Sequence, residues 1–253
     1  MRKNICEPIS YKEQTKINIF GKEYNVLDLT RELSDKIPVY PGHAKTSQWW
    51  HLTHEECVMR LGDTPFEGYA VKGLVTSDHV STHVDAIYHF NKHRPDLTIE
   101  KFPVEHMFTS AVWIDVSYVG PGKHIELEDI KNGLAAAGET IKPGDTLMYY
   151  TGISEKWNNA EAFVTEYPGL SGKATDWILD QGVINVCTDA ISTDLPGDIT
   201  YPNHTRHGER LVVHTELIAN MNKIPLHRFQ FIMTPLKLVN GTGCPVRALA
   251  LWE

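Results

Sequence analysis

The sequence predicts an α/β fold, a single domain of many short strands with two or three helices among them. Segments rich in β-branched and aromatic residues recur along the 253-residue chain and are separated by turn signals. No repeat, low-complexity tract or linker divides the chain. Its length suits one large mixed domain or two small ones. We therefore expect one α/β domain over residues 25–253, preceded by a short N-terminal arm.

The first fifth of the chain is expected to hold this arm and the first strands. Residues 1–24 are polar and lack an amphipathic period, so we expect an irregular arm that packs on its own domain or on a neighbouring subunit. Strands are expected over residues 25–30 and 47–54, and the latter contains Trp49 and Trp50. Adjacent strand residues face opposite sides, so at most one of these tryptophans points into a given pocket. Core or interface packing and substrate contact both stay open for them.

The rest of the chain predicts further strands and two clear helices. The strands are expected over residues 71–75, 110–116, 146–152, 183–188, 229–233 and 246–252. One helix is expected over residues 125–138, ending at Gly138. The other is expected over about residues 173–181, with Ser171 as a candidate N-cap and Gly182 at its end.

Composition favours a folded enzyme or binding domain and argues against nucleic-acid binding. Hydrophobic residues make up 42% and charged residues 22% of the chain, which allows a substantial core. The net charge is −8, and no cluster of basic residues opposes it. The four cysteines show no close spacing, and the first residues lack an apolar signal region. We expect a cytoplasmic protein with free thiols that does not bind a membrane.

The segment from His79 to His89 carries the strongest chemical signal. It contains three histidines and one aspartate, all at odd positions, with β-branched residues at most even ones. A strand would project His79, His83, Asp85 and His89 to one face, with Ser81 leaving room between two imidazoles. A helix could pair His79 with His83, but it would turn the other two side chains away. We therefore favour the strand.

Two imidazoles and a carboxylate on one face suit a divalent transition metal, and three protein ligands leave a position open for water. A single histidine is more often structural or exposed than a ligand, but four such residues in phase favour a metal site. A second dense group follows later in the chain. It consists of His204, His207, His214 and Glu216. Alone this group is weak evidence, but together with the first it could hold a second metal or complete the first site.

On these residues the sequence resembles the cyclase superfamily of metal-dependent hydrolases, which includes bacterial kynurenine formamidase, isatin hydrolase and a dienelactone hydrolase. The family motif, His-x-Gly-Thr-His-x-Asp-x-Pro-x-His, is matched from His79 to His89 at all four chemical positions. Ser81 replaces the motif glycine and Ile87 its proline. Softer similarities lie at residues 28–30, 38–42, 169–171, 204–216 and 235–247.

The resemblance implies a fold and a set of residue roles. The fold would be a single β/β/α domain with a layered, partly barrel-like sheet and flanking helices, assembled as a homodimer or homotetramer. His79, His83 and Asp85 would bind a first metal, and Asp85 and Glu216 could bridge to a second. His204, twelve residues before Glu216, would be a ligand of that second metal, and His89 the proton donor and acceptor. Zinc and manganese, and one or two ions, all stay open. The resemblance gives no role to His207 and His214, which we expect to be structural or on the surface.

The expected reaction is hydrolysis of an amide C–N bond, in a cyclic amide such as isatin or an aryl formamide such as N-formylkynurenine. A divalent ion lowers the pKa of bound water from about 15.7 towards roughly 7, and an imidazole such as His89 suits proton transfer at neutral pH. Hydrolysis of a lactone and a non-catalytic binding role are the alternatives. Aromatic residues that would suit a flat ligand, or equally a core, are Trp49, Trp50, Phe66, Tyr69 and Tyr88.

Overall fold

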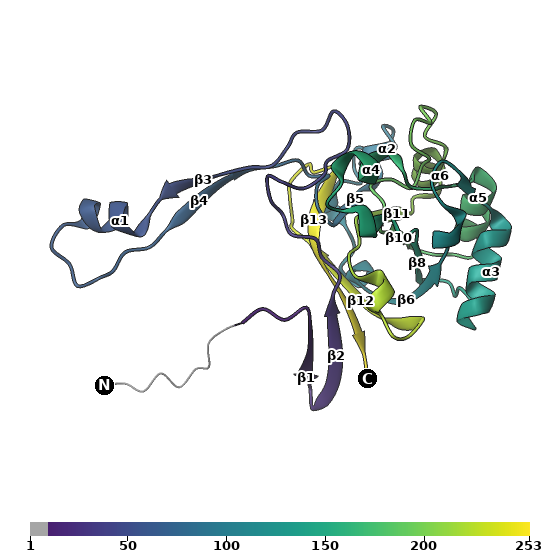
Figure 1. Ribbon diagram of the computed structural model, residues 1–253, viewed down its shortest axis with the longest axis horizontal. Helices are drawn as coiled ribbons and strands as arrows, with labels where there is room; N and C mark the ends of the chain where they lie inside the picture. The colour runs from purple at the N-terminus through teal and green to yellow at the C-terminus, as the bar shows by residue number, and fades with distance from the viewer. Residues whose placement is uncertain (1–9) are drawn as a thin grey trace.

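The computed structural model describes residues 10–253, and in that range nine strands form one sheet around which the fold is built (Figure 1). Seven of them close into a barrel because β13 pairs with both β12 and β5. In order around this ring they are β13 (Gly243–Trp252), β12 (Arg228–Pro235), β6 (Phe108–Asp115), β8 (Thr146–Tyr150), β10 (Asn185–Thr188), β11 (Val213–Glu216) and β5 (His83–Asp85). Strands β6, β8, β10 and β11 run parallel, and the other pairings in the ring are antiparallel. The expected α/β fold with a barrel-like sheet is confirmed.

Strands β6 and β8 are buried over most of their length, which explains their largely apolar sequence. In β6, Ala111 and Trp113 pack with side chains of the other barrel strands, whereas Val112 and Ile114 pack against helices. Those helices are α3 (Leu127–Ala137) and α5 (Gly172–Asp180). The remaining helices are α1 (His54–Leu61), α2 (Ile87–Phe90), α4 (Ala160–Thr165) and α6 (Pro202–Arg210), and β7 (His124–Ile125) pairs with β9 (Gly169–Leu170).

The helix ends follow the capping signals of the sequence. Gly138 follows α3 in the left-handed conformation, with φ 64°, and its amide donates to carbonyls of the last turn. The Ser171 hydroxyl accepts a hydrogen bond from the Ala174 amide at 3.2 Å and caps α5. Both helices therefore begin and end within two residues of the predicted positions.

The N-terminal segment differs from the expected irregular arm. Residues 1–9 of the predicted arm lie outside the described residues, but β1 (Gln14–Ile19) and β2 (Lys22–Asp28) form an antiparallel hairpin, and β2 pairs with β13. The expected boundary at residue 25 thus falls inside β2. Most of β1 is exposed on both faces, so backbone hydrogen bonds hold the strand and no apolar period marks it in the sequence.

A second hairpin projects from the barrel (Figure 1). It consists of β3 (Ser47–Leu52), α1 and β4 (Val71–Val75), and we call residues 47–75 the β3–β4 arm. Helix α1 was not predicted, although Thr53 and Glu56 form a capping box at its start. Trp49 and Trp50 are both exposed. Among residues 10–253, no helix has the length and apolar character needed to cross a bilayer.

Candidate metal centre

The segment from His79 to His89 is not the continuous strand that the sequence predicts. Only His83–Asp85 is a strand, β5, and His89 lies on the short helix α2. The strand cannot extend back through Ser81, because this residue has φ 56°, in the left-handed region that favours glycine. The Ser81 hydroxyl donates to the Arg31 carbonyl at 2.6 Å. The hydroxyl therefore holds the turn in place and does not point between the imidazoles.

Strand pairing brings the two predicted groups of ligands together. Strand β5 runs antiparallel to β11, with His83 opposite Glu216 and Asp85 opposite His214. Directly opposite residues in a sheet project to the same face. All four side chains are buried. The pairing therefore places a histidine and a carboxylate from each strand in one cluster.

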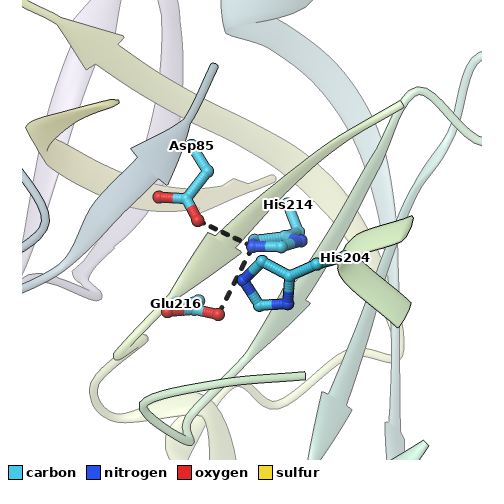
Figure 2. Close-up of side chains that lie close together, drawn as sticks. All are labelled: Asp85, His204, His214 and Glu216. Carbon is cyan, nitrogen blue, oxygen red and sulfur yellow. Dashed lines mark hydrogen bonds and ion pairs between the residues drawn. The ribbon is translucent and has the colours of Figure 1, made fainter. Parts of the chain in front are cut away.

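Asp85 and Glu216 each direct one carboxylate oxygen towards one side of this cluster and the second oxygen towards the other side. Asp85 Oδ1 lies 2.7 Å from His79 Nδ1 and 3.2 Å from His83 Nε2. Asp85 Oδ2 lies 2.7 Å from His214 Nε2 (Figure 2). The two oxygens of Glu216 also face different histidines. Oε2 lies 3.6 Å from His83 Nε2, and Oε1 lies 3.4 Å from His214 Nε2. Of the two carboxylates, only Asp85 belongs to both groups of potential ligand atoms in the described part of the chain, so Asp85 is the one placed to bridge two neighbouring cations.

Within the described part of the chain, the potential ligand atoms fall into two groups that share Asp85. One group is His79, His83 and Asp85, and the other is Asp85, His204, His214 and Glu216. In each group one ligand atom per residue lies within 4.8 Å of the others. Imidazole nitrogens with carboxylate oxygens are a donor set for divalent transition metals.

The buried carboxylate of Glu216 supports the fit of a cation. Its Oε1 atom accepts no hydrogen bond from any residue between 10 and 253, and an unpaired buried acceptor is costly. Burial, together with Asp85 and Asp194, raises the pKa of Glu216 well above its ordinary value. Burial also opposes ionisation of Asp85, but the surrounding histidines hold the pKa of Asp85 well below its ordinary value. A cation at this point would stabilise both carboxylates in their ionised form.

His204 reaches the cluster from α6 and is oriented by Asp194. Asp194 Oδ2 lies 2.6 Å from His204 Nδ1, which leaves Nε2 as the nitrogen free to bind a metal. The same carboxylate accepts hydrogen bonds from the amides of Asn203 and His204, at 2.7 and 3.2 Å. Asp194 thus caps the first turn of α6 and fixes the imidazole that this turn carries.

Two of the other three histidines, His83 and His79, also have outer partners of the kind found around metal ligands, whereas His214 Nδ1 has no hydrogen-bond partner among residues 10–253. His83 Nδ1 lies 2.9 Å from the Ser81 carbonyl, which leaves Nε2 towards the carboxylates. His79 Nε2 lies 2.8 Å from Thr242 Oγ1, and that hydroxyl donates to Asp78 at 2.7 Å. Because the Thr242 hydroxyl is a donor to Asp78, its oxygen can accept from His79 Nε2. His79 therefore turns Nδ1 towards Asp85.

His89 lies beside the cluster but belongs to neither group of ligands. Its Nε2 atom is 3.8 Å from Asp85 Oδ2, and its ring is stacked 4.0 Å from the ring of His79. Burial, with the positive charge that His79 and other nearby imidazoles can carry, lowers the pKa of His89 to about 3. Its imidazole is therefore neutral at physiological pH.

The residues of the cluster other than His214 line a cavity of about 360 Å³, within the range of about 300–1,000 Å³ typical of small-molecule sites. The other side chains around it include Tyr40, His43, Phe90, Ile191 and Tyr201. The five aromatic residues considered for a flat ligand, Trp49, Trp50, Phe66, Tyr69 and Tyr88, do not line the cavity. The aromatic residues that do line the cavity include Phe90, Tyr40 and Tyr201.

The structure places two residues at the site to which the sequence gave no role there, His214 and Asp194. His214 was expected to be structural or on the surface, yet its Nε2 atom points at the two carboxylates. Its spacing of two from Glu216 in an extended segment was a usable signal, because such residues share a face. Asp194 gave no signal beyond being an acidic residue after a buried strand. His207 is buried, as a structural residue would be, and its Nδ1 lies 3.1 Å from the Val212 carbonyl.

Comparison with known proteins agrees with this geometry. The model of one protein family, described as "Putative cyclase", matches residues 27–195, more than half of the chain. A kynurenine formamidase from Salinibacter ruber is 26% identical over 226 residues, which cover 88% of this chain and 96% of that protein. An isatin hydrolase from Roseibium aggregatum is 25% identical over 250 residues, covering 92% and 94%. The crystal structure of an isatin hydrolase bound to the product analogue thioisatinate superposes with a TM-score of 0.79 at 23% identity, covering 91% of this chain and 93% of that one.

Proposed function

The chain belongs to the cyclase family, and from this membership and the metal centre we propose that it is a metal-dependent hydrolase that opens an amide C–N bond. The observation that carries the proposal is the shared cavity of the His79–His83–Asp85 group and His89. A place for a divalent ion and a non-ligand imidazole beside it are the two parts that such a hydrolysis needs.

The substrate we propose is a small aromatic amide, either a cyclic amide such as isatin or an aryl formamide such as N-formylkynurenine. The names of the relatives in this family support both. The cavity supports them too, because about 360 Å³ suits one bicyclic or disubstituted monocyclic aromatic molecule and the aromatic side chains of Phe90, Tyr40 and Tyr201 surround it.

We assign His79, His83 and Asp85 to one divalent ion and Asp85, His204 and Glu216 to a second, either zinc or manganese. When bound, such an ion lowers the pKa of water and polarises the substrate carbonyl. Neighbouring groups of the protein orient these metal-binding histidines. Asp194 holds His204, the Ser81 carbonyl holds His83, and Thr242 holds His79.

His89 is the proposed catalytic acid–base residue. It lines the cavity next to Asp85 without belonging to either group of ligands. As a neutral imidazole it can accept the proton that water loses on attack at the carbonyl carbon. It can then deliver this proton to the leaving nitrogen as the C–N bond breaks. Such assistance is typically worth about 10²–10⁴-fold in rate.

Substrate profiling of the zinc- and manganese-loaded protein tests the proposal. We expect turnover of isatin or N-formylkynurenine and loss of that turnover after treatment with a chelator. Turnover of a dienelactone alone would favour the C–O alternative on the same site. Inactivity towards all three with either metal would favour a binding protein and contradict the hydrolase.

We also propose that the enzyme is a homodimer or homotetramer in which the β3–β4 arm packs on a second copy of the chain. The arm exposes Trp50, Leu74 and Val75 at 60%, 50% and 57%. A two-stranded hairpin is only marginally stable in water by itself, and clustered exposed apolar residues mark protein contacts.

For the cellular location we propose the cytoplasm. The buried free thiols of Cys57, Cys187 and Cys244, which are in the described part of the chain, support a reducing compartment.

A further inference from the structure

We propose that His214 is a fourth protein ligand of the ion assigned to Asp85, His204 and Glu216. The inference rests on the proposed function only in taking a divalent ion to bind in this cavity. It gives the two ions different coordination. The ion at His79, His83 and Asp85 has three protein ligands, whereas the ion at β11 has four.

The pairing of β11 with β5 places His214 in the centre of the cluster. His214 lies directly opposite Asp85 in the ladder and two residues before Glu216 on its own strand. Both relations put side chains on the same face of a sheet. The His214 side chain has no exposed surface, so its direction is set by the strand and not by solvent.

The nitrogen of His214 that faces the cluster meets two carboxylate oxygens. Its Nε2 atom lies 2.7 Å from Asp85 Oδ2 and 3.4 Å from Glu216 Oε1 (Figure 2). A proton on Nε2 can form a good hydrogen bond to Asp85, but Glu216 Oε1 then accepts no hydrogen bond from any described residue. A cation held by the Nε2 lone pair and by both oxygens would satisfy all three atoms at once.

The neighbours of His214 separate it from an ordinary core histidine. On one side the ring of His204 is 4.7 Å away, and His204 belongs to the same group of ligand atoms. On the other side the ring of His207 is 5.0 Å away, but His207 belongs to neither group and contacts the Val212 carbonyl instead. Two buried histidines in contact therefore have different surroundings, and His207 is a matched control.

Four protein ligands have a chemical consequence. Structural zinc sites are usually closed by four protein ligands, whereas catalytic sites keep three and leave one position for water or substrate. The site with His214 is then the closed one, and it would hold its ion more tightly. The site of His79, His83 and Asp85 keeps the open position and faces the substrate.

Metal analysis of the full-length protein tests the assignment. Apoprotein is loaded with zinc, passed through a desalting column, and its zinc is measured by mass spectrometry. We expect two equivalents per chain in the wild type and in His207→Phe, but one in His214→Gln and one in His204→Gln. In a competition titration with a chromophoric chelator, His214→Gln should bind the second zinc ion at least tenfold more weakly than the wild type does. Equal zinc content and affinity in His214→Gln and the wild type would overturn the proposal.

A measurement without any variant covers the case in which His214→Gln does not fold. In zinc-soaked crystals of the wild type, the anomalous signal at the zinc edge should place an ion about 2.0–2.1 Å from His214 Nε2. An ion bound to Glu216 but not to His214 would overturn the proposal. Substrate assays report separately on the proposed function. A wild type that binds two ions but hydrolyses none of the amides would contradict the hydrolase and leave the assignment of His214 intact.

Discussion

At the scale of single residues, the chemistry depends on which histidines each of the two carboxylate oxygens of Asp85 contacts. Oδ1 faces His79 and His83, and Oδ2 faces His214 and, at 3.8 Å, His89. The same carboxylate therefore contacts both groups of ligands and the proposed acid–base residue. A change at His89 should affect proton transfer without affecting metal binding, because His89 belongs to neither group.

The first prediction concerns His89→Ala. We expect kcat to fall by about 10²–10⁴-fold, because the acid–base group is lost, while the metal content stays at the wild-type level. Steady-state kinetics and metal analysis on the same preparation measure both. The matched control is His93→Ala, four residues further on and exposed, which should leave both quantities unchanged. Loss of metal from His89→Ala would instead make His89 a ligand.

The second prediction concerns Asp194→Asn. Asp194 fixes His204 through a contact of 2.6 Å between Oδ2 and Nδ1, and outer partners of this kind are typically worth about 10–100-fold in metal affinity. We expect a loss of that size for the ion that His204 binds, measured by competition with a chelator. Asp198→Asn is the control, because Asp198 is half-buried and its carboxylate accepts hydrogen bonds from Thr200, not from His204. Similar losses in both variants would show that the loop, and not the orientation of His204, sets the affinity.

At the scale of elements, the sequence predicted regular structure well where burial or capping determines it. Strands β6, β8, β10, β12 and β13 and helices α3 and α5 are apolar or capped in recognisable ways. The motif from His79 to His89 was predicted to gather its side chains, and it does so. The reason differs from the predicted one. Ser81 adopts φ 56° and α2 starts at Ile87, and these turns, not one continuous strand, bring the four residues together.

Other features of the fold could not be predicted from the sequence. The pairing of β5 with β11 joins residues about 130 positions apart, and no local pattern states which strands are neighbours. This pairing is what assigns His214 to the metal centre. Strand β1 and helix α1 bury few side chains, so the apolar periods that mark buried elements are missing there.

Helix α6 carries the third prediction, which concerns stability in acid. Burial lowers the pKa of His207 to about 3, below the ordinary value of about 6.5. The unfolded chain therefore takes up a proton at a higher pH than the folded chain. The stability from neutral His207 is complete above pH 6.5 and is lost as the pH falls towards 3, with a slope of up to about 1.4 kcal/mol per pH unit.

Replacing His207 by Phe should remove this dependence. Between pH 7.0 and 5.5 the free energy of unfolding of the wild type should fall by about 1 kcal/mol more than that of His207→Phe. Urea unfolding followed by circular dichroism measures the difference, and groups common to both proteins cancel in it. An equal fall in both proteins would mean that His207 keeps an ordinary pKa in the folded state.

At the scale of the whole molecule, the barrel and the β3–β4 arm differ in how they are stabilised. The barrel encloses its own core, whereas the arm extends from it as a hairpin with an exposed helix (Figure 1). Within the arm, the Trp49 ring lies against Gly73, where an added Cβ would come within 2.2 Å of the ring. Trp50 lies on the opposite face, where Lys72 is 4.8 Å above its ring.

The fourth prediction is that this arm joins two copies of the chain. Trp50→Ser combined with Leu74→Ser removes apolar surface from one face of the hairpin without changing the barrel. We expect multi-angle light scattering to give the mass of at least two chains for the wild type and of one chain for the double variant at micromolar concentration. Phe20→Ser is the control, because Phe20 is fully exposed but lies at the β1–β2 turn. The metal content should stay unchanged, because no ligand lies on the arm. A wild type that is already a single chain, or a double variant that stays a dimer, would contradict the proposed contact.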